Sequence, residues 1–405
     1  MMELSPALQF VIECARRSCG ASARALPVDP DWEDVFRHAD GQSLFSAVAS
    51  VVDTPLDGAP GSDSRRQIQV RATVAQMQRR LRQEPGIQRV LSVLQEAGCG
   101  PVLLKGAALA YSRYVRPEFR SFADLDLLLP ADELERANVA LLASGFEVNA
   151  AAPMPDGHQH LAPLFAPHRE IVVELHSTLF EARCPFDITI NEWIARAVPM
   201  TILGHSVHML SATDALLHTC AHLSYGHRYL RYPLRSLTDI LALTQHGAVN
   251  WTALVWRAQE AQMNGAVVWP LAVARAWLGA PIPTWVIQQL MPAQPIRWLI
   301  GTAMGSGYIL DRESITNDGT AVAYERLLEL SILGRSSVVA WGKVLFNGLF
   351  PPANAVTHLS SEPPASPILH AFRLVRPTRV GRGLRAMSRL IAQRDDWTRS
   401  EAFTD

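Results

Sequence analysis

The sequence lacks the patterns that mark several large classes of protein. Five cysteines occur without a Cys-x-x-Cys pair, so neither a zinc ribbon nor a disulfide framework is expected. The N-terminus has no basic stretch followed by an apolar run, and no apolar run approaches the roughly 18 residues that a membrane span needs. A formal net charge of −1 gives no general attraction to nucleic acid or to an anionic membrane. These absences favour a cytoplasmic protein without stable membrane insertion.

Lysine is also scarce, because only Lys105 and Lys343 occur among the 37 basic residues. Arginine is therefore the default basic residue, and each lysine marks a position where that default was not used. The remaining composition is ordinary, with 48% hydrophobic and 19% charged residues in a chain of 405. Such a chain is long enough for two or three domains and a large core.

The hydrophobic pattern divides the chain into four regions. Residues 1–97 show helical periodicity, and residues 98–205 change to short strand patterns that alternate with helices. Residues 206–350 are helical again, and residues 351–405 have the composition of a proline-rich linker and a basic tail. Strands and helices that alternate with short connections indicate a mixed α/β unit. The predicted fold class is therefore α+β, with a small mixed sheet between two helical regions.

Individual elements follow from the same pattern. Strands are expected at 102–104, 124–129, 146–148 and 171–176. Helices are expected at 65–97, 107–114, 132–144, 214–224, 234–245, 251–262, 265–278 and 321–346. Asp132 is expected to cap the helix at 132–144, and Gly145 is expected to end it.

Two aspartates stand two residues apart in the expected strand at 124–129. Because side chains alternate along a strand, Asp124 and Asp126 share one face, whereas Leu125 and Leu127 face the opposite side. Carboxylates about 7 Å apart along a strand can share one or two hard divalent cations. Ligation by oxygen alone suits Mg²⁺ or Mn²⁺. The alternative is a solvent-facing edge strand, since Asp-x-Asp is a common pattern.

A third carboxylate lies in the expected strand at 171–176. Val172, Glu174 and His176 share one face of this strand. A glutamate inside an apolar strand is costly unless it is paired, protonated or bound to a metal. If the two strands are neighbours, Glu174 completes a three-carboxylate site of the two-metal type that serves phosphoryl transfer. The alternative for Glu174 is an ion pair with a basic neighbour such as Arg120.

Lys105 and Gly106 stand where the expected strand at 102–104 runs into a helix. Glycine permits close backbone approach, and the free N–H groups at a helix N-terminus favour phosphate. Lys105 adds a mobile positive charge for a triphosphate. The segment is no Walker A loop, since Gly-x-x-x-x-Gly-Lys-Ser/Thr is absent. Its position ahead of the two aspartates gives this short pattern its weight.

These segments together resemble a known family. They are similar to the uncharacterised nucleotidyltransferases of the DNA polymerase β-like superfamily, which are akin to AbiEii-type toxin nucleotidyltransferases. The resemblance covers roughly residues 90 to 350. It is carried by the run Leu-Leu-Lys-Gly-Ala-Ala-Leu-Ala-Tyr, by Arg120-Ser121, by Asp124-Leu-Asp126-Leu-Leu-Leu, by Val-Glu174-Leu-His176, and by Ala-His222-Leu and Leu234-Arg235-Ser-Leu-Thr-Asp239-Ile in the helical part.

The resemblance implies a nucleotidyltransferase palm that moves NMP from an NTP to an acceptor, with Mg²⁺ or Mn²⁺, and releases pyrophosphate. Asp124, Asp126 and Glu174 would be its catalytic and metal-binding residues. The nucleotide would be bound by Lys105, Gly106, Arg120 and Ser121. Members of this branch often occur near genes for natural-product biosynthesis or surface polysaccharides. Small molecules, peptides and RNA therefore stay open as acceptors, and the oligomeric state is unknown.

One position departs from the superfamily pattern. The usual turn is Gly-Ser or Gly-Gly, whereas Gly106 is followed here by Ala107, so a hydroxyl is missing. This departure favours a second interpretation, in which the chain is a catalytically inactive nucleotide-binding or regulatory protein that keeps the palm fold. Triphosphate binding is therefore a weaker expectation than metal binding.

Further polar residues lie in the helical region. His218 and His222 share a helix face and, with His227 and His176, are candidates for a zinc site, although the glutamate of a His-Glu-x-x-His site is missing. A substrate-facing role is the preferred interpretation for His176, His222, Arg235 and Asp239. Arg235 and Asp239 stand at i and i+4, so a plain ion pair between them is the alternative.

The C-terminal tail is basic. Between residues 373 and 389 it carries six arginines and no acid, namely Arg373, Arg376, Arg379, Arg382, Arg385 and Arg389. Their spacing lets most of them share one flank of a helix. Docking on the protein's own acidic surface, contact with an anionic membrane and RNA binding are all open for this segment.

Overall fold

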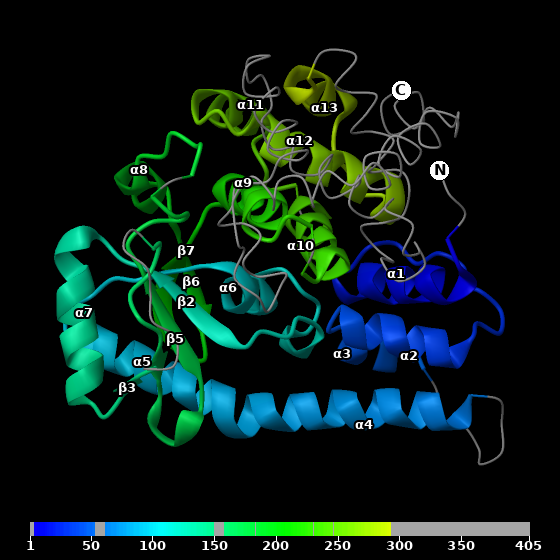
Figure 1. The fold of residues 1–405 in the computed structure, drawn as a ribbon, viewed down its shortest axis with the longest axis horizontal. Coiled ribbons are helices and arrows are strands. Elements are labelled where there is room, and N and C mark those ends of the chain that lie inside the picture. Colours follow the sequence, from blue (N-terminus) through cyan, green and yellow to red (C-terminus); the bar gives the residue numbers. More distant parts are fainter. Residues whose placement is uncertain are drawn as a thin grey trace, which may run out of the picture.

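The computed structural model describes residues 4–52, 61–149, 158–182, 184–229, 231–245 and 247–292. Within these residues a seven-stranded mixed sheet has helices before and after it in the sequence (Figure 1). The predicted α+β class is therefore confirmed. No helix in this part of the chain is long and apolar enough to cross a membrane. The expected helix at 321–346 and the basic tail lie outside the described residues.

The region before the sheet is helical. Ser5 accepts a hydrogen bond from the backbone N–H of Leu8 and so caps the first helix, while Asp31 caps the second through two such bonds. The elements are α1 (Pro6–Ser18), α2 (Trp32–Gly41), α3 (Phe45–Ala49), α4 (Ser62–Gln78), the π-helical segment η1 (Arg79–Gln83) and α5 (Glu84–Glu96). Segments α4, η1 and α5 follow one another without a break and form the long rod along the lower edge of Figure 1.

The long rod confirms the helix expected at 65–97, and its two ends differ in burial. α5 packs beneath the sheet through Ile87, Val90, Leu91 and Leu94. The preceding segments leave an apolar stripe exposed, made of Val70, Val74, Met77 and Leu81. Periodicity of apolar residues therefore predicted the helix correctly without predicting which of them are buried.

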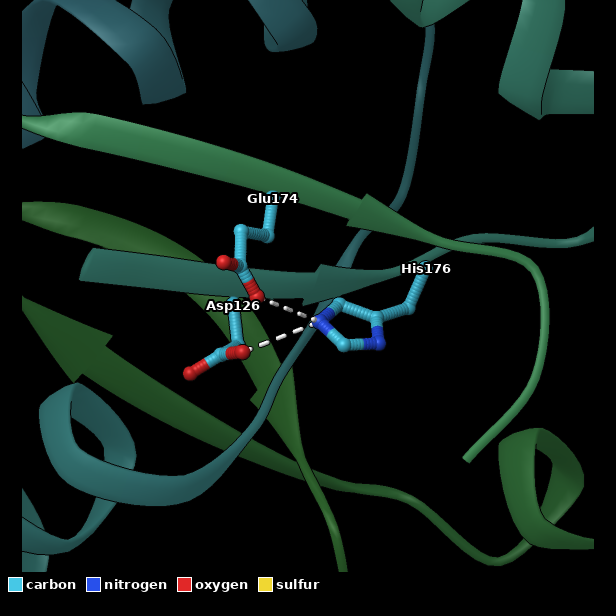
Figure 2. A group of neighbouring side chains, drawn as sticks. All are labelled: Asp126, Glu174 and His176. Carbon is cyan, nitrogen blue, oxygen red and sulfur yellow. Dashed lines mark hydrogen bonds and ion pairs between the residues drawn. The ribbon is translucent and has the colours of Figure 1, made fainter. Parts of the chain in front are cut away.

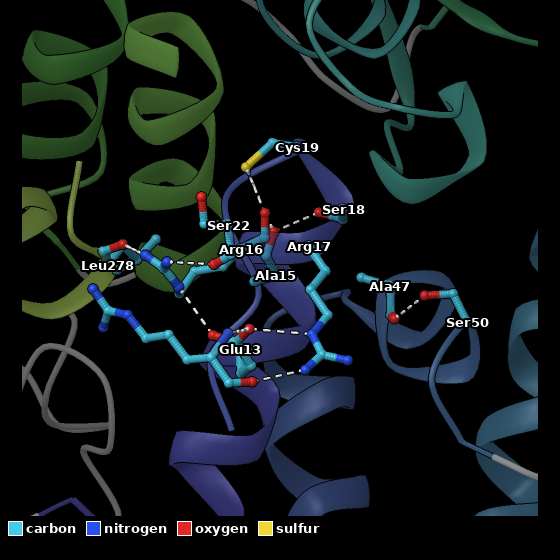
Figure 3. Close-up of polar contacts among 11 residues, drawn as sticks. Glu13, Ala15, Arg16, Arg17, Ser18, Cys19, Ser22, Ala47, Ser50 and Leu278 are labelled. Carbon is cyan, nitrogen blue, oxygen red and sulfur yellow. Dashed lines mark hydrogen bonds and ion pairs between the residues drawn. The ribbon is translucent and has the colours of Figure 1, made fainter. Parts of the chain in front are cut away.

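A polar cluster holds α1 against the last described helices. Glu13 is buried and accepts hydrogen bonds from Arg16 at 3.0 Å and from Arg17 at 3.1 Å (Figure 3). Arg16 also donates to the backbone carbonyl oxygens of Leu278 and Ser22. Because each buried charge has partners, the cost of removing it from water is offset. The cluster thus ties the start of the chain to a segment more than 250 residues away.

The sheet has the strand order β3-β4-β5-β2-β1-β7-β6. Its central pair, β2 and β5, is parallel, and β1 is antiparallel to β2 but parallel to β7. Two antiparallel pairs, β3 with β4 and β6 with β7, form the edges. The strands are β1 (Val102–Leu103), β2 (Asp124–Leu128), β3 (Glu147–Val148), β4 (Leu164–Phe165), β5 (Val172–His176), β6 (Val198–Ile202) and β7 (His205–Met209).

The two faces of the central strands meet different surroundings. Leu125, Leu127, Val173 and Leu175 enter a core shared with α5, α6 (Lys105–Ser112) and α7 (Ala131–Ala143). On the other face, Leu128 packs into the core of the helices that follow the sheet. Strand alternation therefore turns the residues between the leucines toward the C-terminal helices.

The helices after the sheet lie above it in Figure 1, with α9 and α10 nearer the sheet than α11 and α13. α9 begins at the side chain of Ser211 and α11 at that of Asn250, each of which accepts a backbone N–H. The elements are α8 (Ile190–Ala195), α9 (Ala212–Ala221), the π-helical segment η4 (His222–Gly226), α10 (Pro233–Gln245), α11 (Trp251–Glu260), α12 (Asn264–Val273), η5 (Ala274–Leu278) and α13 (Thr284–Leu290).

Several expectations need correction. The cap expected at Asp132 is wrong, because α7 starts at Ala131 after Pro130 and Asp132 lies in its first turn. Strands β4, β6 and β7 were not expected. The stop at Gly145 is confirmed, since this glycine has a φ of +87° directly after the helix.

Candidate active site

Strands β2 and β5 bring the predicted acids to one face of the sheet. In their parallel register Asp124 is opposite Val172, Asp126 opposite Glu174 and Leu128 opposite His176. Residues paired in this way point to the same side of the sheet. The condition set by the sequence, that the two strands be neighbours, is met.

Asp126, Glu174 and His176 converge on one point in Figure 2. The Nε2 atom of His176 lies 2.9 Å from Oδ1 of Asp126 and 3.5 Å from Oε2 of Glu174. One possible ligand atom from each of the three residues lies within 4.8 Å of the other two, a condition that no other such group in the described residues meets. Two carboxylates and an imidazole are donors that divalent cations accept, so the set fits a metal ion.

Asp126 is the most enclosed carboxylate of the site, with 2% of its surface exposed. Lys105 Nζ lies 2.6 Å from its Oδ1 atom. Burial alone would raise the pKa of Asp126, but the charge of Lys105 and the hydrogen bond from His176 hold this pKa well below its usual range. Asp126 is therefore ionised at neutral pH, with two positive or polar groups directed at a single oxygen.

Asp124 has a different environment from Asp126. Burial, followed by repulsion from Asp126 and Glu174, raises the pKa of Asp124 to about 6. Its side chain does not belong to the group of three that converges at Asp126. The two aspartates were expected to act alike, but their pKa values are shifted in opposite directions. Further positive charge at this face would lower the raised pKa of Asp124.

The turn at Lys105 and Gly106 has a strained and crowded backbone. Lys105 has a φ of +47°, which is uncommon for a residue with a side chain. A Cβ atom at Gly106 would lie 2.7 Å from Cβ of Phe122, so only glycine fits at this position. The N–H of Leu104 donates to the carbonyl oxygen of Asp126 at 3.0 Å and fixes the turn to β2. Strain of this kind is concentrated at functional sites.

His160 joins the site although the sequence analysis did not single it out. Its Nε2 atom lies 3.4 Å from Oε2 of Glu174, and its ring centroid lies 5.0 Å from that of His176. A single β-bridge between His160 and His176 places it there. The only signal in the sequence was the pair of histidines at 158 and 160, which by itself indicates no site.

Comparison with known proteins agrees with this geometry. The sequence model of a family described as uncharacterised nucleotidyltransferases matches residues 29–279, more than half of the chain. The chain belongs to this nucleotidyltransferase family. No curated protein and no solved structure matches it. The matched range includes every residue from Lys105 to Asp239 that was considered for the site. The expected relation to AbiEii-type toxin nucleotidyltransferases stays a prediction.

The basic residue before the two aspartates, Arg120, is joined to the helical region. Arg120 donates from Nε at 2.7 Å and from Nη2 at 2.8 Å to the two oxygens of Asp239 on α10. Tyr114 donates to the same carboxylate at 2.7 Å. Ser121 donates to the carbonyl oxygen of Ser43 at 3.1 Å. The ion pair considered for Glu174 with Arg120 is therefore absent from the described contacts, as is one between Arg235 and Asp239.

The other three histidines considered for a zinc site lie on α9, at the start of η4 and directly after η4, namely His218, His222 and His227. The ring centroids of His218 and His222 lie 5.8 Å apart, and those of His222 and His227 lie 4.2 Å apart. Burial, followed by the charge of Lys105, lowers the pKa of His218 to about 3 and that of His222 well below its usual range. Within the described residues these histidines do not form a three-ligand group with His176, so the geometry gives no support to the zinc site.

Proposed function

We infer that the protein transfers NMP from an NTP to an acceptor and releases pyrophosphate, with Mg²⁺ or Mn²⁺ as cofactor. The single observation that carries this proposal is the register of β2 and β5, which sets Asp126 opposite Glu174 beside the Lys105–Gly106 turn. Family membership supports nucleotidyl transfer in general. The cofactor, the NTP and the acceptor go beyond what family membership supports and are part of this proposal.

Asp126 and Glu174 would hold the cation, with Asp124 on the same face as a further carboxylate. A bound divalent cation supplies positive charge that stabilises the phosphates and lowers the pKa of a hydroxyl. His176 is better suited to orient Asp126 than to bind the metal. Its Nδ1 atom is buried without a hydrogen-bond partner in the described structure, whereas metal-binding histidines usually donate from their second nitrogen.

Lys105 is proposed to exchange partners during the reaction. In the structure its ammonium group neutralises Asp126, and a cation bound there would free it for the phosphates of the NTP. Gly106 lets the start of α6 pack against Phe122, so that the turn stays close to β2. Arg120 and Asp239 are proposed to position this turn, because their buried ion pair ties the segment before β2 to α10 and Arg120 Nη1 lies 3.3 Å from the position of a Cβ atom at Gly106.

The reaction would follow from this arrangement. An acceptor hydroxyl oxygen forms a bond to the α-phosphorus, while the bond from that phosphorus to the bridging oxygen of pyrophosphate breaks. The hydroxyl proton passes to a base or to water, and pyrophosphate leaves with the electron pair. Small hydroxylated molecules, peptides and RNA fit this chemistry equally, and natural-product biosynthesis is one setting in which such acceptors occur.

Turnover of labelled NTPs tests the proposal. The protein is incubated with Mg²⁺ or Mn²⁺, each α-³²P-labelled NTP and pools of small molecules, peptides or RNA, and label transfer and pyrophosphate are measured. We expect a labelled acceptor and pyrophosphate with wild type, and a loss of at least about 100-fold with Asp126→Asn. Asp132→Asn, an exposed acid in α7, is the matched control and should behave as wild type. Equal turnover by Asp126→Asn and wild type would refute the proposed site.

A second candidate is a catalytically inactive nucleotide-binding or regulatory protein. Ala107 favours it, because this position carries no hydroxyl and its side chain is buried in the core under the sheet. Thermal melting with and without MgNTP separates the two. An inactive binder is stabilised by the nucleotide but releases no pyrophosphate with any acceptor pool. An active enzyme is stabilised by the nucleotide and also releases pyrophosphate.

A further inference from the structure

Two arginines lie near the carboxylate of Asp239 on α10, but only one of them pairs with it. The two oxygens of Asp239 accept from Arg120 at 2.7 and 2.8 Å, and one of them also accepts from Tyr114. Arg235 stands one helical turn before Asp239 on the same helix and is not among its partners. Asp239 is therefore satisfied without Arg235, and the group of Arg120, Arg235 and Asp239 carries one net positive charge.

Arg235 itself has no acidic partner in the described part of the chain. Its guanidinium carbon lies 4.1 Å from the ring centroid of Tyr232, a cation–π contact. Its Nε atom is buried and makes no hydrogen bond to any described residue. Burial, followed by repulsion from Arg120, lowers the pKa of Arg235 to about 10. The side chain stays charged at neutral pH in a half-buried position. The nearby charge of Asp239 favours this cation, but the Asp239 carboxylate is bound by Arg120, so Arg235 has no acidic hydrogen-bond partner of its own in the described residues.

Arg120 relates Arg235 to the proposed active site. The Nη1 atom of Arg120 lies 3.3 Å from the position that a Cβ atom would take at Gly106, and its partner Asp239 stands one helical turn after Arg235 on α10. Lys105, which directly precedes Gly106, lies 2.6 Å from Asp126. Basic side chains therefore extend from the carboxylates on the sheet toward α10.

We propose that Arg235 forms a subsite for the terminal phosphate of a nucleoside triphosphate, while Lys105 serves the phosphates nearer the carboxylates. This assignment rests on the proposed use of an NTP. A guanidinium in contact with the ring of Tyr232 is restricted in position, and its planar set of donors matches the geometry of phosphate oxygens. Because the third phosphate distinguishes an NTP from an NDP, Arg235 sets the preference for triphosphates.

The stability of the free protein gives an independent signature. An unpaired charge in a half-buried position costs free energy unless a ligand compensates it. Replacing a residue that only stabilises the fold lowers the melting temperature. Replacing a charged residue that serves to bind a ligand with a neutral residue does not lower the melting temperature of the free protein. We therefore expect Arg235→Gln to melt no lower than wild type when no ligand is present.

The experiment uses tripolyphosphate and pyrophosphate as probes, with Mg²⁺ in excess so that Lys105 is free for phosphate, in isothermal titrations of the full chain. Wild type should bind tripolyphosphate at least about tenfold more tightly than pyrophosphate, since charge-assisted hydrogen bonds contribute on this scale. Arg235→Gln should reduce this ratio to about one. Arg231→Gln is the matched control, because Arg231 is exposed and lies 5.6 Å from the same Tyr232 ring. Its ratio should stay within about twofold of wild type.

Several results would overturn the assignment. They are an unchanged ratio in Arg235→Gln, an equal loss in both variants, and a failure of MgNTP to compete with tripolyphosphate. Should Arg235→Gln not fold, Arg235→Lys carries the test, since lysine keeps the charge but lacks the planar donors. A ratio lowered about threefold or more then supports the subsite, and an unchanged ratio overturns it.

The same titrations separate this subsite from the proposed reaction. Arg235-dependent binding of tripolyphosphate without turnover of any NTP would retain the subsite and refute the transfer. Turnover of NTP together with a ratio that Arg235→Gln leaves unchanged would retain the transfer and refute the subsite.

Discussion

Asp126 on β2 and Glu174 on β5 are register partners in a parallel pair of strands, although 48 positions separate them in the sequence. The pairing fixes both carboxylates on the face of the sheet that is turned toward the C-terminal helices. Strands β2 and β5 are neighbours, so a divalent cation between them would be held by two carboxylates on rigid strands rather than on a loop.

Replacing Lys105 should destabilise the metal-free protein. Lys105→Met leaves the buried carboxylate of Asp126 with His176 as its remaining charged or polar side-chain partner. We expect the free energy of unfolding to fall by about 1–3 kcal/mol. Urea unfolding without divalent cation measures this change, and addition of Mg²⁺ should reduce the difference from wild type. A variant as stable as wild type without cation would show that the ion pair contributes nothing.

Gly106→Ala should disturb the turn at the start of α6. The added Cβ atom would lie 2.7 Å from Cβ of Phe122, so β2 or α6 must shift. Overpacking of this kind costs about 1–3 kcal/mol, and displacement of Lys105 should lower turnover as well. Gly100→Ala is the matched control, because nothing lies within 4 Å of a Cβ atom there. Thermal melting of the two variants should differ clearly, and equal melting would contradict the account of the turn.

Removing one partner of the Arg120–Asp239 pair should destabilise the protein more than removing both. Both side chains are buried, so Asp239→Asn leaves an uncompensated guanidinium and should cost about 3–5 kcal/mol. The double variant Arg120→Met with Asp239→Leu removes both charges and should recover much of this loss. Urea unfolding of Arg120→Met, of Asp239→Leu and of the double variant measures the coupling. Purely additive losses would indicate that the two residues act independently.

His218 should make the stability depend on pH. Its pKa is about 3 in the folded protein and about 6.5 when unfolded, so the unfolded state binds the proton more tightly. Stability is complete above pH 6.5 and declines as the pH falls from 6.5 toward 3. Between pH 7.5 and 5.5 this histidine accounts for a loss of about 1.4 kcal/mol. Urea unfolding at both pH values should show a smaller loss for His218→Phe, and an equal loss would contradict the assignment.

The sequence predicted those parts of the site that follow from local periodicity. Asp126 and Glu174 could be placed on strand faces because leucine and valine alternate with them. The inequality of Asp124 and Asp126 could not be predicted, since it arises from Lys105 and His176, which approach one oxygen of Asp126 only. Two aspartates in one motif therefore have opposite pKa shifts.

Contacts between distant segments account for the rest. Arg120 and Asp239 are 119 positions apart, and nothing in the sequence around either residue indicates that they pair. His160 reaches Glu174 through one β-bridge in a segment without strand periodicity. Strand β4 has two residues and β6 contains Pro199, so neither gives a clear strand pattern.

Titration with Mn²⁺, followed by electron paramagnetic resonance, tests the central claim most directly. We predict that wild type binds Mn²⁺, that Mg²⁺ competes for the same site, and that Asp126→Asn and Glu174→Gln each weaken binding at least about tenfold. Asp132→Asn should leave the affinity unchanged. Wild type without bound Mn²⁺, or an Asp126→Asn variant that binds it as tightly as wild type, would contradict the assignment of this face of the sheet as the metal site.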